Sequence, residues 1–135
     1  MPDSHSTLRV YIVEDSAIFR KLLVTAVEAA GGDLIGTSEN AQQAILELQN
    51  LHPDLVLLDI ALSAGSGFDV LRAIQARGFA EAATKVVLTN YVTAENRELS
   101  FLLGASHFFD KSTEGWQALE LINRMAAERR NRGRG

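Results

Sequence analysis

The chain has 135 residues, of which 47% are apolar and 22% are charged, and it contains no cysteine. This length corresponds to one domain, because a chain of this size buries roughly two thirds of the surface that it exposes when unfolded. The composition and the net charge of −4 argue against a membrane span, a disordered chain, a disulfide framework and general binding to nucleic acid.

Apolar runs alternate with helical spacing along the whole chain. The first half predicts a strand at 8–13, a helix at 17–30, a strand at 33–38, a helix at 41–51 capped by Asn40, and a strand at 54–58. The second half predicts a helix at 68–76, a strand at 85–89, a helix at 94–103, a strand at 105–110 and a helix at 113–128. In the first helix the apolar spacing is carried by Ile18, Leu22, Val24 and Val27.

The strands are continuous apolar runs, which indicates a sheet covered on both faces. Strands that alternate with helices run parallel and are joined by right-handed crossovers. The sequence therefore predicts an α/β fold, with a doubly wound five-stranded parallel sheet and five helices. Residues 8–128 should form this domain, 1–7 a flexible N-terminus, and 129–135 a basic, solvated C-terminal tail.

Residues able to handle a phosphoryl group or a metal stand at four of the strand ends. Glu14 and Asp15 follow the first strand, Asp59 follows the third, Thr89 ends the fourth, and Lys111 follows the fifth. Because the carboxyl ends of parallel strands share one edge, where such folds bind ligands, these side chains should meet in one crevice.

Three converging carboxylates need a compensating charge. Two carboxylates about 4 Å apart repel by roughly 4 kcal/mol at an effective dielectric near 20. One lysine cannot cancel three negative charges, whereas a divalent cation can, and oxygen ligands without His or Cys point to Mg²⁺. Such a metal could bridge a carboxylate and an incoming phosphoryl group while Lys111 and Thr89 contact the other oxygens, with a carboxylate as the nucleophile.

Taken singly, these residues also have structural interpretations. Asp59 could cap the next turn, Glu14 and Asp15 could lead into a helix, Lys111 could be a solvated charge, and Thr89 could reflect strand propensity. Their joint placement favours the functional interpretation.

The sequence around these residues resembles the response-regulator receiver domain of two-component signalling. The resemblance covers residues 8–128. Within the family, the chain is most similar in form to the stand-alone regulators of chemotaxis. It rests on four stretches in family order and spacing, at 13–16, at 57–62 with Ser66-Gly67, at 87–90 and at 104–111. It implies a flavodoxin-like sheet with strand order 2-1-3-4-5.

The resemblance also implies residue roles. Asp59 would be the phosphoacceptor, and Thr89 and Lys111 would hold the phosphoryl oxygens. The implied ligands of Mg²⁺ are Asp15, Asp59, the backbone carbonyl of Ala61 and, commonly through a metal-bound water, Glu14.

In the family, phosphorylation acts as a switch. The phosphoryl group draws the hydroxyl of Thr89 inward, and the aromatic residue three positions before the lysine, here Phe108, turns into the vacated space. The resemblance therefore implies a population shift that alters the face formed by residues 94–128, where partners would bind.

Many receivers have a proline after the lysine, joined by a cis bond, where this chain has Ser112. A cis bond before a residue other than proline costs about 2.5–4 kcal/mol, so we predict a trans bond between Lys111 and Ser112.

Ala61 and Tyr91 flank the path by which water reaches the acyl phosphate in receivers. Ala61 cannot orient a water and Tyr91 can partly cover the site, so the hypothesis is that the phosphorylated form is comparatively long-lived. Tyr91 could equally be an exposed aromatic without a kinetic role.

The expected function is a phospho-accepting signalling switch, not a metabolic enzyme, that catalyses its own Mg²⁺-dependent phosphorylation and dephosphorylation. A sensor histidine kinase or a histidine phosphotransfer protein would be the donor. No attached DNA-binding domain and no membrane contact are expected, so an unidentified protein partner would receive the signal, and a homodimer is left open. Residues 1–7 lack the apolar core of a secretory signal, so a cytoplasmic location is expected.

Other functions remain open at this point. A receiver fold could serve as a phosphorylation-independent binding module, although the intact acid set counts against this. An aspartate-nucleophile phosphatase usually has a second acid where this chain has Ala61. Flavin binding is disfavoured because no hydroxyl-rich phosphate loop follows the first strand. The basic tail could also contact nucleic acid or an acidic partner.

Overall fold

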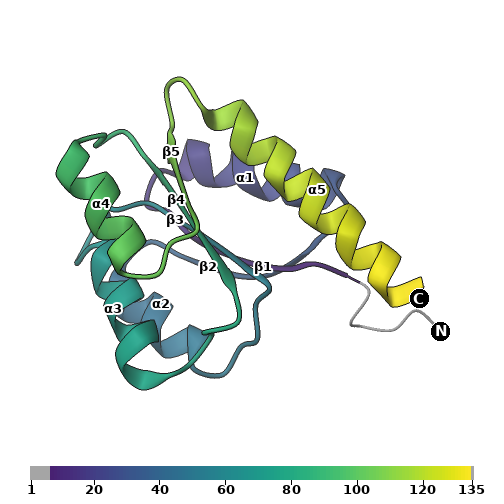
Figure 1. Cartoon of the computed structure of the whole chain (residues 1–135), viewed down its shortest axis with the longest axis horizontal. Coiled ribbons are helices and arrows are strands. Elements are labelled where there is room, and N and C mark those ends of the chain that lie inside the picture. Colours follow the sequence, from purple (N-terminus) through teal and green to yellow (C-terminus); the bar gives the residue numbers. More distant parts are fainter. Residues whose placement is uncertain (1–6, 135) are drawn as a thin grey trace.

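The computed structural model describes residues 7–134 (Figure 1). Of the predicted flexible N-terminus at 1–7, all but Thr7 lies outside the described residues. Within the described range five strands alternate with five helices. The strands are β1 (Arg9–Val13), β2 (Asp33–Ser38), β3 (Leu55–Leu58), β4 (Thr84–Thr89) and β5 (His107–Asp110). The helices are α1 (Ala17–Ala29), α2 (Ala41–Leu48), α3 (Gly67–Arg77), α4 (Ala94–Leu102) and α5 (Gly115–Arg134).

The five strands form one parallel sheet with the order β2-β1-β3-β4-β5. Figure 1 shows α1 and α5 on one side of this sheet and α2, α3 and α4 on the other. The predicted α/β class, the parallel sheet and the flavodoxin-like strand order are therefore confirmed. Within the described chain, none of the helices combines the length and the apolar character that crossing a membrane requires.

Each strand contributes alternate side chains to two apolar clusters, one on each face of the sheet. On β1, Val10 and Ile12 pack in the cluster formed with α1 and α5, whereas Tyr11 and Val13 pack in the cluster formed with α2 and α3. All four are fully buried. The strands are continuous apolar runs because neither face of the sheet is exposed to water.

The helix predicted from the apolar spacing is present as α1, but two of the four residues that carried this spacing face solvent. Ile18 is 86% exposed and Leu22 is 51% exposed, while Leu23 and Val27 are buried against the sheet. Phe19, which the spacing did not single out, packs against the α1 and α5 cluster. Two stripes one residue apart along this helix are both apolar, and tertiary packing decides between them.

The end of α5 also differs from the prediction. The helix continues to Arg134 instead of ending at residue 128, so the predicted end of this helix is wrong. Residues 130–132 are exposed to solvent. An Nη atom of Arg129 lies 3.6 Å from the carboxylate of Asp54, and Nη1 of Arg130 donates a hydrogen bond of 2.8 Å to the carbonyl of Ala30. These contacts attach the polar end of α5 to the start of β3 and to the end of α1.

The other boundaries lie within two residues of the prediction, except that α2 ends at Leu48 instead of residue 51. Asn40 caps α2 as predicted, since its side chain accepts a hydrogen bond of 2.8 Å from the amide of Gln43. At the start of α3, a Cβ atom on Gly67 would clash with the backbone carbonyl of Asp59. Glycine at this position lets α3 begin directly beside the end of β3.

Candidate functional site

The register of the sheet brings the acidic strand ends together. Val13 pairs with Leu58 in the neighbouring strand, so Glu14 and Asp59 leave the sheet side by side. One carboxylate oxygen from each of Glu14, Asp15 and Asp59 lies within 4.8 Å of the other two. The predicted convergence of the three carboxylates is therefore confirmed.

Lys111, which follows the edge strand β5, reaches the same group of carboxylates. Thr89 pairs with Asp110 across β4 and β5, and the amide of Lys111 donates to the carbonyl of Thr89 at 3.0 Å. The Nζ atom of Lys111 lies 2.7 Å from Oε1 of Glu14 and 2.7 Å from Oδ2 of Asp59. The lysine thus bridges two of the three carboxylates. The peptide bond between Lys111 and Ser112 is trans, as predicted.

Burial controls the electrostatics of this group. The side chain of Glu14 is 1% exposed and that of Lys111 is 9% exposed. Burial raises the pKa of Glu14, because desolvation of the carboxylate outweighs the hydrogen bond from Lys111. Burial alone would lower the pKa of Lys111, but its hydrogen bonds and charge contacts with Asp59 and Glu14 outweigh this and raise it. The lysine is therefore held in its charged form.

The donor set fits a hard divalent cation. It consists of carboxylate oxygens from Glu14, Asp15 and Asp59, and of these side chains Asp15 is exposed to solvent. Lys111 supplies one positive charge against three negative ones, so the group retains an excess of negative charge. Mg²⁺ prefers oxygen ligands and usually keeps several waters, which suits an acidic cluster with one face open to solvent.

Thr89 and Ala61 lie at the same edge. Thr89 is fully buried, and its Oγ1 accepts a hydrogen bond of 3.1 Å from the amide of Tyr91. The amide of Ala61 donates to Oδ1 of Asp59 at 3.2 Å. The ring of Tyr91, in the loop between β4 and α4, is 59% exposed. Asp59 is thus engaged through both carboxylate oxygens, by Lys111 on one and by Ala61 on the other.

Phe108 lies in the core in this structure. Its side chain is 3% exposed and belongs to the cluster on the α2 and α3 side of the sheet. The guanidinium carbon of Arg97 lies 5.5 Å from the centre of the Phe108 ring and 5.8 Å from that of Phe101. The ring of Phe108 therefore already occupies the inward position that the family resemblance implies for the phosphorylated form. Its turn on phosphorylation stays a prediction.

Two contacts of the site were not foreseen from the sequence. The ring of Phe19 lies 4.4 Å from Nζ of Lys111, and Arg97 covers Phe108. The available signal for the first was an aromatic residue in the first turn of the helix that follows Glu14 and Asp15. Helical spacing alone did not distinguish it from its apolar neighbours.

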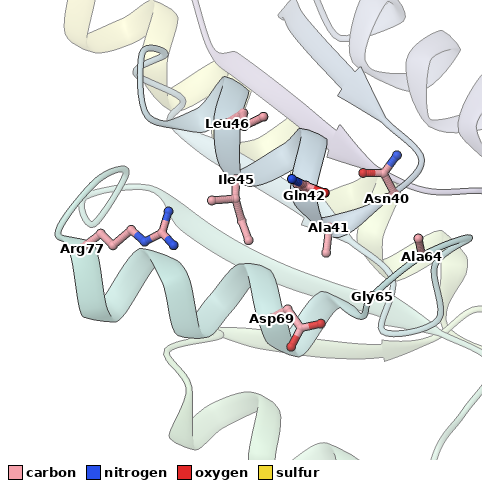
Figure 2. A pocket seen from close by; sticks show the side chains of 9 residues that line it. All are labelled: Asn40, Ala41, Gln42, Ile45, Leu46, Ala64, Gly65, Asp69 and Arg77. Atoms are coloured by element: carbon pink, nitrogen blue, oxygen red, sulfur yellow. The ribbon is translucent and has the colours of Figure 1, made fainter.

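A separate hollow of about 560 Å³ lies between α2 and α3 (Figure 2). Figure 2 shows Ile45 pointing from α2 toward α3, and Asp69 and Arg77 along α3. The carboxylates and the lysine of the sheet edge do not line it. The cavity and the polar cluster are therefore distinct features of the molecule.

The fold and the acidic sheet edge together define a receiver-type signalling domain. A family model described as the response regulator receiver domain matches residues 10–123. The chain therefore belongs to this family, which acts in two-component signalling.

Comparison with curated proteins gives relatives of several kinds. The chain is 24% identical to the chemotaxis protein CheY of Thermotoga maritima over 119 residues, which make up 87% of this chain and 97% of that protein. It is 34% identical to a protein-glutamate methylesterase/protein-glutamine glutaminase of Symbiobacterium thermophilum over 108 residues. That match covers 77% of this chain but 29% of the relative, so the chain spans less than a third of the methylesterase.

Solved structures show the same fold. A CheY-like response regulator receiver domain protein from Methanospirillum hungatei aligns with a TM-score of 0.77 and 24% identity, covering 93% of this chain and 98% of that chain. The response regulator domain of Thermotoga maritima CheB aligns with a TM-score of 0.75 and 20% identity, covering 93% of this chain and 97% of that chain.

Proposed function

We propose that the protein is a phospho-accepting signalling switch. Asp59 takes a phosphoryl group from a sensor histidine kinase or a histidine phosphotransfer protein, and the face formed by residues 94–128 then changes its affinity for a protein partner. The observation that carries this proposal is the position of Lys111, whose ammonium lies 2.7 Å from both Glu14 and Asp59 within the acidic cluster.

The chemistry is nucleophilic attack by a carboxylate oxygen of Asp59 on phosphorus. The bond between phosphorus and the imidazole nitrogen of the donor breaks, a bond between phosphorus and the Asp59 oxygen forms, and the imidazole leaves and takes up a proton. Lys111 and the hydroxyl of Thr89 bind the phosphoryl oxygens. Mg²⁺ would be held by Asp15, Asp59 and the Ala61 carbonyl with Glu14 assisting, and it supplies the positive charge that offsets the carboxylates and the phosphoryl group.

Exposed apolar residues beside the site support docking of a protein donor there. Ile18 is 86% exposed and Leu22 is 51% exposed, and both line a hollow of about 390 Å³ that also includes Lys111 and Ser112. Because large exposed apolar side chains grouped on one surface mark interaction sites, this rim of α1 is where the donor would approach Asp59.

A connected set of contacts supports transmission to the face at 94–128. Lys111 and Thr89 are joined by a backbone hydrogen bond, and Arg97 on α4 contacts both the buried Phe108 and the exposed Phe101. A change in packing around Thr89 or Phe108 would therefore alter the contacts of Arg97 and, through them, the surface of α4. Phosphorylation would favour one of two packings of these groups.

The second candidate is a phosphorylation-independent binding module with a receiver fold. One observation favours it, namely that Phe108 already lies in the inward position at 3% exposure. If the chain held this packing permanently, its 94–128 face would bind a partner without phosphorylation.

Exposure to Mg²⁺ and phosphoramidate tests the proposal, with intact mass measured for the wild type and for Asp59→Asn. The proposal expects one phosphoryl mass gain in the wild type and none in the variant. Beryllofluoride, a phosphoryl mimic, should also change the fluorescence of Trp116, which is 59% exposed near the start of α5. Absence of any mass gain, together with binding of a partner that Asp59→Asn leaves unchanged, would select the binding module.

A further inference from the structure

The ammonium of Lys111 lies against an aromatic ring as well as against carboxylates. Its Nζ atom is 4.4 Å from the centre of the Phe19 ring, in addition to the 2.7 Å contacts with Glu14 and Asp59. Cations within about 6 Å of an aromatic ring centre are attracted by its electron-rich face, most strongly where water is excluded. The side chain of Lys111 is 9% exposed, so this contact lies in a largely desolvated setting.

Local structure fixes the ring in this place. Ser16 caps α1 and accepts a hydrogen bond of 3.2 Å from the amide of Phe19, and its own amide donates to Oε2 of Glu14 at 3.0 Å. Glu14 therefore anchors the cap that sets the first turn of α1. The ring of Phe19 also packs against the apolar cluster under α1 and α5. The ring of Phe19 therefore lines the site in a position that is fixed by packing and by the helix cap.

We propose that Phe19 is a positioning residue that holds the Lys111 ammonium at the mouth of the site. The two carboxylates that bind the lysine, Glu14 and Asp59, are also candidate ligands of a divalent cation, so two cations share the same oxygens. An aromatic face does not compete as a ligand of a cation that prefers oxygen. Phe19 therefore keeps the ammonium of Lys111 near Asp59 when Glu14 and Asp59 bind a divalent cation. That Lys111 contacts a phosphoryl group from this position rests on the proposed function.

Three substitutions separate the aromatic contact from simple packing. Phe19→Leu keeps an apolar side chain but removes the electron-rich face, whereas Phe19→Trp keeps that face and strengthens it. Phe79→Leu is the matched control, because Phe79 is also a partly buried phenylalanine packed against an apolar cluster, and it lies outside the face formed by residues 94–128. A purely structural role for Phe19 would not follow the order Trp, Phe, Leu.

The direct test is the proton NMR shift of the Lys111 side-chain methylenes in the unphosphorylated protein, with and without Mg²⁺. We expect these protons to be shifted upfield by the ring in the wild type, in Phe19→Trp and in Phe79→Leu, and to lose the shift in Phe19→Leu. The upfield shift should persist in Mg²⁺. Equal shifts in wild type and Phe19→Leu, or loss of the wild-type shift in Mg²⁺, would overturn the proposal.

The second readout is the rate of phosphorylation by phosphoramidate in Mg²⁺. Phe19→Leu should slow it about fivefold, while Phe19→Trp and Phe79→Leu should stay within about twofold of the wild type. An unchanged rate in Phe19→Leu would show that the ring is only a neighbour and would refute positioning. If the wild type accepts no phosphoryl group, the proposed function fails, and the NMR comparison still decides whether Phe19 holds Lys111.

Discussion

Replacing Lys111 with methionine should make the stability of the protein depend strongly on a divalent cation. The lysine lies 2.7 Å from each of two carboxylates whose side chains are 1% and 6% exposed. At an effective dielectric near 20, each contact corresponds to roughly 6 kcal/mol of attraction before desolvation is subtracted. Removing one partner of a buried ion pair costs about 3–5 kcal/mol, because the charge left behind stays buried. We expect Lys111→Met to lower the free energy of unfolding by about 3 kcal/mol in EDTA.

Urea unfolding followed by circular dichroism, in EDTA and in Mg²⁺, measures this effect. Mg²⁺ at about 100 times its dissociation constant stabilises a folded protein by roughly 2.7 kcal/mol, so it should restore most of the loss. Lys85→Met is the matched control, because Lys85 is also buried but its Nζ donates to the backbone carbonyl of Glu81. Lys85→Met should gain from Mg²⁺ only as much stability as the wild type gains. Wild-type stability of Lys111→Met in EDTA, or a gain from Mg²⁺ in Lys111→Met no larger than that of the wild type, would refute this reasoning.

Three further predictions concern pH, packing and kinetics. Burial raises the pKa of Glu14 above 4.5, so the folded state holds this proton more tightly than the unfolded chain, and the stability it contributes is lost as pH rises through 4.5 toward the raised pKa. Urea unfolding between about pH 4 and about pH 8 should therefore show a steeper decline for wild type than for Glu14→Gln, and parallel curves would contradict this. Phe108→Ala should cost about 3–5 kcal/mol of unfolding free energy, and Phe101→Ala, at 43% exposure, clearly less, so equal losses would argue against the buried position. Tyr91→Glu should speed release of phosphate from the phosphorylated protein by at least about tenfold in a phosphate-release assay, because an acid there can orient the attacking water, and slower release would contradict the shielding hypothesis.

The fold and the polar cluster were predictable because their signals are local. Each apolar run is followed directly by its polar residue, and parallel strands bring their carboxyl ends to one edge without further information. Glu14 and Asp59 are neighbours because the residues before them, Val13 and Leu58, are paired in the sheet. The convergence of these carboxylates at one edge of the sheet therefore followed from the order of strands and helices in the sequence.

What the sequence did not reveal depends on contacts between distant parts of the chain. Phe19 and Ile18 are both apolar, and only packing against α5 and the sheet decides that the first turns inward and the second outward. The last turns of α5 have no apolar periodicity, and they are attached instead by Arg130 to the carbonyl of Ala30, 100 residues away. The strand pattern accounts for the buried ring of Phe108, but it does not encode the turn of this ring that the family resemblance implies.

The most direct test of the central claim is to locate the phosphoryl group chemically. After treatment with phosphoramidate, borohydride reduces an aspartyl phosphate to homoserine, and tandem mass spectrometry identifies the converted residue. The account predicts conversion at Asp59 in Mg²⁺ and almost none in EDTA. Conversion at Asp15 or elsewhere, or conversion at Asp59 that does not depend on Mg²⁺, would contradict it.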